Sequence, residues 1–102
     1  MIYANKKVQE SPNQAAQHAK IIDTMLQLQE KEFVRIEGQT VWLRSNLWKN
    51  VLLAQNWMKC AHIYCNLILK YNKKSPLEFR DIETDAVIGK LNGKQVKVLL
   101  FH

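Results

Sequence analysis

Apolar side chains recur at helical spacing along the whole segment from residue 45 to residue 71. Ser45 or Asn46 can cap this helix at its start, and Asn72 begins the polar stretch that ends it. At 1.5 Å per residue, the helix would be roughly 40 Å long. The chain has 102 residues with only three Gly and two Pro, which favours a few long elements over many short strands. One long helix therefore constrains the fold more than any other feature.

The remaining patterns predict a second helix and several strands. Ser11 is a suitable cap and Pro12 a suitable first residue for a helix over about 12–32. Short β-prone runs predict strands over 33–36, 40–43, 77–82, 86–91 and 94–101. Asn92-Gly93 is a preferred turn pair, and a hairpin turning there would pair Val87 with Val98.

These elements predict an α+β fold in a single domain spanning 1–102. Two helices, about 12–32 and 45–71, pack on a mainly antiparallel sheet of four or five strands. Residues 1–10 are expected to form a flexible lead-in or an edge strand.

Composition indicates an ordinary globular protein in a reducing compartment. The chain is 47% hydrophobic and 24% charged, and no apolar run approaches the ~18 residues of a membrane span. The first residues lack the features of a secretory signal, which predicts a cytoplasmic location. Cys60 and Cys65 lie five residues apart, which separates helical Cα atoms by roughly 8–9 Å. This distance exceeds the ~7 Å limit for a disulfide, so two free thiols are expected.

Positive charge is concentrated in the middle of the chain. The formal net charge is +6, and residues 38–77 carry six cations without one Asp or Glu, whereas both flanking segments are balanced. On a helical wheel these cations share one side, where i,i+4 acid–base pairs would be usual. A plain solvated face is one interpretation. The other is a nucleic-acid interface made of Arg44, Trp48, Lys49, Gln55, Lys59, Lys70, Lys73 and Lys74.

The same side of the expected helix carries an apolar group. It consists of Trp48, Leu52, Ile63 and Leu67. Either another segment of the chain covers these side chains, or they form a contact patch. The second case predicts a protein–protein interaction module, such as a homodimer or a small inhibitor that docks on an acidic protein surface. A third option, a basic helix lying on anionic lipid, would require the apolar helix face to leave the core.

No catalytic or metal-binding motif is present. Cys60, His62 and Cys65 point in different directions on a helix, so they cannot share one Zn²⁺ or form a thiolate–imidazole pair. Phosphate-binding Gly loops and nucleophile motifs are absent. We therefore expect a binding protein without enzymatic activity, metal or cofactor.

Overall fold

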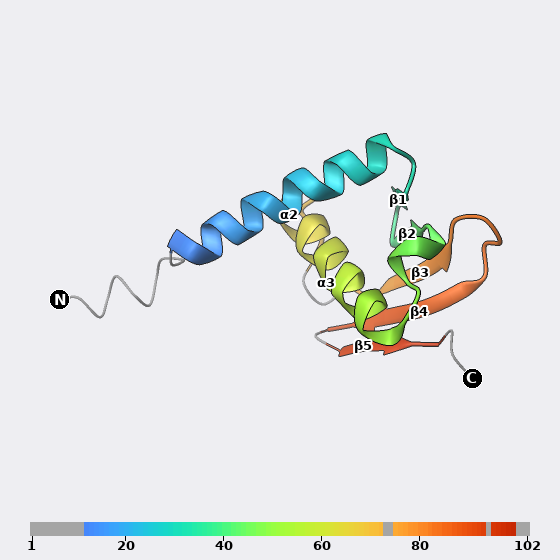
Figure 1. Ribbon diagram of the computed structural model, residues 1–102. Coiled ribbons are helices and arrows are strands. Elements are labelled where there is room, and N and C mark those ends of the chain that lie inside the picture. The colour runs from blue at the N-terminus through green and yellow to red at the C-terminus, as the bar shows by residue number, and fades with distance from the viewer. Residues whose placement is uncertain (1–11, 73–74, 94, 100–102) are drawn as a thin grey trace.

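The computed structural model describes residues 12–72, 75–93 and 95–99 (Figure 1). Within these residues the elements are α2 (Pro12–Glu30), β1 (Val34–Glu37), β2 (Thr40–Leu43), the 3₁₀ turn η1 (Ser45–Leu47), α3 (Val51–Leu67), β3 (Leu77–Asp81), β4 (Val87–Asn92) and β5 (Gln95–Val98). The α+β fold is confirmed, with two helices packed on a mainly antiparallel five-stranded sheet and a C-terminal hairpin. The expected lead-in over 1–10 lies outside the described residues.

The strands lie in the sheet in their order along the chain, from β1 to β5. β1–β2, β3–β4 and β4–β5 pair antiparallel, whereas β2 and β3 pair parallel. A parallel pair needs a long crossover connection, and here η1 and α3 supply it. The helices lie on one side of the sheet (Figure 1).

Buried and half-buried side chains alternate along the strands, so the sheet has one face toward the core and one face toward solvent. Leu77 and Phe79 of β3 are buried, while Glu78 and Arg80 between and beyond them are half-buried. Side chains of a strand point alternately to the two faces, so the helices cover the face of Leu77 and Phe79. We call the other face, which carries Glu78 and Arg80, the open face.

Helix α3 supplies the centre of the core. Its buried side chains are Ala54, Met58, Ala61, Tyr64 and Cys65, which belong to the predicted apolar helix face. α3 packs against α2 and β5, and α2 packs against β1. The core is completed mainly by strand residues, including Val34, Val41, Leu43, Leu77, Phe79, Ile88 and Leu91.

The second helix is shorter than the continuous helix expected over 45–71. Asn50 is extended (φ −141°, ψ 170°), and its side chain accepts a hydrogen bond of 2.8 Å from Leu53 N, so it caps α3 in place of Ser45 or Asn46. At the other end Lys70 takes a left-handed conformation (φ 61°), and Tyr71 N donates to the Cys65 carbonyl. Because α3 is capped locally at both ends, the segment expected to be one long helix consists of η1, a short non-helical stretch and the shorter α3.

The C-terminal hairpin turns one residue later than expected. Asn92 pairs with Gln95 and Gly89 pairs with Val98, so Val87 is not the partner of Val98. Gly93 has a positive φ of 65°, which Gly adopts without a Cβ clash. This register decides which side chains of β4 and β5 lie directly opposite each other.

Candidate nucleic-acid interface

Arg44 does not lie on α3. It follows β2 in extended conformation, and its Nη2 donates to the Glu32 carbonyl at 3.0 Å. Its guanidinium lies 5.4 Å from the centroid of the Phe33 ring, and the adjacent hollow is also lined by Glu32 and Glu83. Arg44 is therefore separated from the other predicted basic residues and surrounded partly by acids.

Trp48 is half-buried rather than presented for stacking. It lies in the break before α3 and packs against the core. Its Nε1 donates to the Leu43 carbonyl at 3.2 Å. The hydrogen bond and the packing against the core leave only part of the Trp48 side chain accessible, which makes it a less suitable platform for base stacking than a fully exposed ring.

The remaining predicted basic residues are spread along the helix side of the molecule. Lys49 precedes the cap of α3, Lys59 lies in the middle of the helix, and both are exposed. Gln55 is half-buried, and Lys70 follows the end of the helix. Lys73 and Lys74 lie outside the described residues.

The four-residue apolar group is divided in the same way. Leu52 is 79% exposed near the start of α3, whereas Ile63 and Leu67 line a hollow with His18 of α2. Leu52 and Ile63 are eleven residues apart, which is about 16 Å along a helix. Trp48 is half-buried against the core, so the predicted patch is not one continuous surface.

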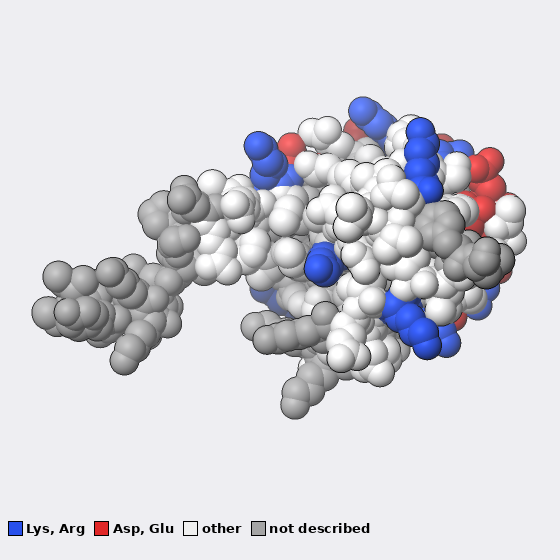
Figure 2. All heavy atoms as spheres, turned by 60° about the horizontal axis from the view of Figure 1, so that its bottom comes forward, with Lys and Arg blue, Asp and Glu red and all other residues white. Residues whose placement is uncertain are grey.

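Figure 2 shows how charge is distributed on the side that forms the bottom of Figure 1. Lys and Arg side chains appear there as separate projections on a largely uncharged surface. Acidic side chains gather toward one side of this view. The cations visible on this side do not form a continuous stripe.

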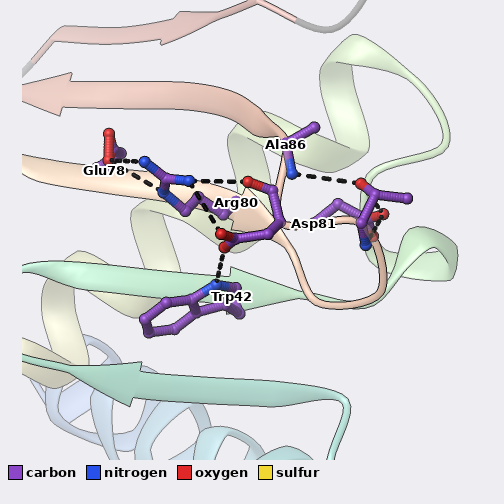
Figure 3. A network of polar contacts seen from close by, with 7 residues as sticks. Trp42, Glu78, Arg80, Asp81 and Ala86 are labelled. Atoms are coloured by element: carbon purple, nitrogen blue, oxygen red, sulfur yellow. Dashed lines mark hydrogen bonds and ion pairs between the residues drawn. The ribbon is translucent and has the colours of Figure 1, made fainter.

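One end of the open face holds a closed polar network (Figure 3). Arg80 Nη2 lies 3.1 Å from Glu78 Oε2, and its Nη1 lies 3.3 Å from Asp85 Oδ2. Trp42 Nε1 donates to Asp85 Oδ1 at 2.7 Å, and the Arg35 guanidinium lies 4.2 Å from the centroid of the Trp42 ring. Arg35 and Arg80 are thus occupied by partners within the protein.

The loop beside this network is organised by one buried carboxylate. Asp81 is 5% exposed, and its Oδ2 accepts bonds from Thr84 N at 3.1 Å and Thr84 Oγ1 at 2.7 Å. Thr84 Oγ1 in turn accepts from Ala86 N (Figure 3). The segment after β3, which contains Glu83 and Asp85, is therefore a structural turn that carries Asp85 to Trp42 and Arg80.

Beside this network, the β4–β5 side of the open face carries two lysines that form no ion pair within the described residues, although Glu78 of β3 pairs with one of them, Lys90, in the register. Lys90 of β4 lies directly opposite Lys97 of β5, and both are exposed. Among the described residues, ion pairs join Arg35 and Arg80 to carboxylates, and none includes Lys90 or Lys97. Like charges directly across a strand pair are destabilising, so this arrangement favours a bound anion.

A shallow hollow of about 360 Å³ adjoins Lys90. Its lining comes from the ends of β2, β3 and β4 and comprises Gln39, Thr40, Pro76, Leu77, Glu78, Lys90, Leu91 and Asn92. The sequence-based interpretation did not include Glu78, Lys90 or Lys97, because residues 78–102 carry equal numbers of cations and anions. Strand alternation was the available signal, since it places Lys90 and Lys97 on the solvent side of the hairpin.

The thiols and the imidazole of α3 form no reactive group. Burial raises the pKa of Cys65 from 9.0 to about 11 and also raises the pKa of the half-buried Cys60. His62 Nε2 lies 3.3 Å from Asn66 Nδ2. No three His, Cys, Asp or Glu side chains of the described residues could hold a metal ion together.

The comparisons with known proteins leave the site to be judged on its geometry. No family model matches the chain, and neither a curated protein nor a solved structure matches it. Within the part of the chain that the structure describes, neither helix is long and apolar enough to cross a membrane.

Proposed function

We propose that this chain is a non-enzymatic protein that binds nucleic acid, with Lys90 and Lys97 at the centre of the contact. The observation that carries the proposal is the pairing of two exposed lysines directly across β4 and β5, neither of which forms an ion pair among the described residues. The carboxylate next to them in the register, Glu78 opposite Lys90, is engaged by Arg80. A phosphate group between the two lysines would replace repulsion with charge-assisted hydrogen bonds. The formal net charge of +6 favours the same class of ligand.

The surface proposed here differs from the helix face indicated by the sequence. Lys90 and Lys97 alternate with core-facing residues of their strands and belong to the open face, whereas Lys49 and Lys59 flank or belong to α3 on the covered side of the sheet. The two lysine pairs therefore form separate surfaces. This separation allows one experiment to distinguish them.

The experiment measures binding of fluorescently labelled DNA and RNA, single-stranded and duplex, at several salt concentrations. Lys90→Gln with Lys97→Gln should weaken binding and reduce the slope of log K against log salt by about 1.4–1.8, the contribution of two phosphate contacts. The matched control, Lys49→Gln with Lys59→Gln, removes the same charge and should bind nearly as the unmodified protein does. The opposite result would assign the interface to α3, and absence of binding at low salt would refute the proposal.

Two observations support the absence of enzymatic activity in this proposal. Burial raises the pKa of both thiols, so neither is a thiolate nucleophile at neutral pH. The buried Asp81 is held in its own loop through Oδ2. Free thiols also accord with the expected cytoplasmic location.

The exposure of Leu52 favours a second candidate function, contact with another protein. Leu52 is 79% exposed and the neighbouring Val51 is 43% exposed, next to the start of α3. The partner would be a second copy of this chain or an acidic protein that also meets Lys49. Light scattering at two concentrations tests the homodimer, and Leu52→Asp should dissociate it without unfolding the protein. A monomer at high concentration, unchanged by Leu52→Asp, would remove the homodimer.

A further inference from the structure

We propose that the hollow at the end of the open face receives one base of a single-stranded nucleic acid, with a preference for guanine. This inference rests on the proposed function and adds the type of ligand and the group that selects it. Glu78 would accept hydrogen bonds from the base, and Lys90 with Lys97 would hold the adjoining phosphate.

The strand register places the required groups in one row across the sheet. Thr40 pairs with Glu78, Glu78 with Lys90, and Lys90 with Lys97. Directly paired residues on one face of antiparallel strands, here Glu78 with Lys90 and Lys90 with Lys97, have Cβ atoms about 4.5–5.5 Å apart. A hydroxyl, a carboxylate and two ammonium groups therefore follow one another on the open face, and the first three line the hollow.

Glu78 is held in place by a bond pattern that leaves one oxygen available. Arg80 Nε and Nη2 both contact Glu78 Oε2, at 3.2 and 3.1 Å (Figure 3). No described residue donates to Glu78 Oε1, and the side chain is 32% exposed. An ionised carboxylate can only accept hydrogen bonds, so its ligand must present N–H or O–H donors.

The size and composition of the hollow favour a flat, polar ligand rather than a bare anion. Its volume of about 360 Å³ lies at the lower end of the range for small-molecule sites. Pro76 supplies an apolar surface, and the amides of Gln39 and Asn92 supply further donors and acceptors. Inorganic phosphate would engage the lysines but would leave Glu78 facing a like charge.

Guanine matches the carboxylate better than the other bases. Its Watson–Crick edge presents two adjacent donors, N1–H and the N2 amino group. Adenine and cytosine each place an acceptor nitrogen beside their amino group, which a carboxylate repels. This edge is occupied in a duplex and free in a single strand, so the site selects unpaired nucleic acid.

The test compares two labelled single strands of roughly 12 nucleotides, a length within the site sizes of single-strand binders. One contains thymine only, and in the other guanine replaces every third thymine. We expect the unmodified protein to bind the guanine-containing strand about fivefold more tightly, toward the lower limit of base discrimination by side-chain hydrogen bonds. Glu78→Gln should reduce this ratio to below about twofold, because a neutral amide oxygen is a weaker acceptor than a carboxylate oxygen and the amide NH₂ group would face the guanine donors.

Glu37→Gln is the matched control. Glu37 pairs with Thr40 at the other end of the same row, contacts Arg35 and does not line the hollow. Like Glu78→Gln, the variant Glu37→Gln removes one negative charge from the open face. The affinity ratio between the guanine-containing strand and the thymine strand should therefore remain about fivefold. Equal loss of the ratio in Glu37→Gln and Glu78→Gln would overturn the inference.

The outcomes separate this inference from the proposed function. Equal affinity of the unmodified protein for both strands would overturn the guanine site and leave nucleic-acid binding intact. Failure to bind either strand would overturn both. If Glu78→Gln does not fold, the inference is tested by NMR titration of the unmodified protein with the guanine-containing strand. The chemical shifts of the side-chain amides of Gln39 and Asn92 should then change. Shifts confined to other surfaces would overturn the inference.

Discussion

Gly89→Ala tests how closely α3 approaches the sheet. A Cβ at Gly89 would lie 2.5 Å from Met58 Cε, 2.9 Å from Met58 Sδ and 3.0 Å from the Lys97 carbonyl oxygen. Replacing Gly by Ala in a strand should by itself stabilise the fold by about 0.5–1 kcal/mol, because the unfolded chain is less free. Overpacking in a filled core costs about 1–3 kcal/mol. We therefore expect a net loss of about 1–2 kcal/mol in the free energy of unfolding, allowing for partial relaxation of Met58.

Urea denaturation followed by Trp fluorescence measures this loss, and thermal unfolding should show a decrease of about 4–8 °C in Tm per kcal/mol. Met58→Ala alone should cost about 2–5 kcal/mol, because it leaves a cavity under α3. In that background Gly89→Ala should be neutral or stabilising, since the clashing Met58 atoms are gone. A single variant as stable as the unmodified protein, or losses that simply add in the double variant, would refute this account of the packing.

Three further predictions concern the open face and the core. Trp42→Phe should cost about 0.5–1.5 kcal/mol in urea denaturation, because Asp85 Oδ1 loses its indole donor; an unchanged midpoint would contradict this. Asp81→Ala should cost about 1–3 kcal/mol and accelerate amide exchange at Thr84, which loses its acceptor; unchanged exchange would show that the loop holds without it. Burial raises the pKa of Cys65 from 9.0 to about 11, so this thiol stabilises the folded state fully below pH 9 and loses that contribution as the pH rises toward 11. Urea denaturation of Cys65→Ala should therefore show a shallower loss over that pH window, and an identical loss would assign it to other groups.

The strands and the first helix could be anticipated because their signals are local. Alternation in Thr40–Leu43 and Leu77–Asp81 matched β2 and β3, and the apolar spacing after Pro12 matched α2. The extent of the second helix was harder to judge, because Ser45, Asn46 and Asn50 are all suitable caps. The Asn50 side chain accepts the bond from Leu53 N, and the residues before it form η1.

The candidate site depended on neighbours that the sequence does not identify. The excess of positive charge in residues 38–77 predicted an interface there, but Arg44 lies beside Glu32 and Trp48 is half-buried against the core. Lys90 and Lys97 looked unremarkable in a segment with equal numbers of cations and anions. Their significance comes from the register that sets them opposite each other and from the ion pair with Arg80 that engages Glu78, the carboxylate opposite Lys90.

The sequence by itself determined which side chains face the core, because the periods of two and 3.6 residues arise within each strand or helix. It also determined the excess of positive charge. Only the tertiary structure decided that β2 and β3 lie parallel and that Glu78, from one part of the chain, sits between Thr40 and Lys90 from two others. Such neighbours depend on how the crossover through α3 packs on the sheet, and the free energy of that packing is shared among residues far apart in the chain.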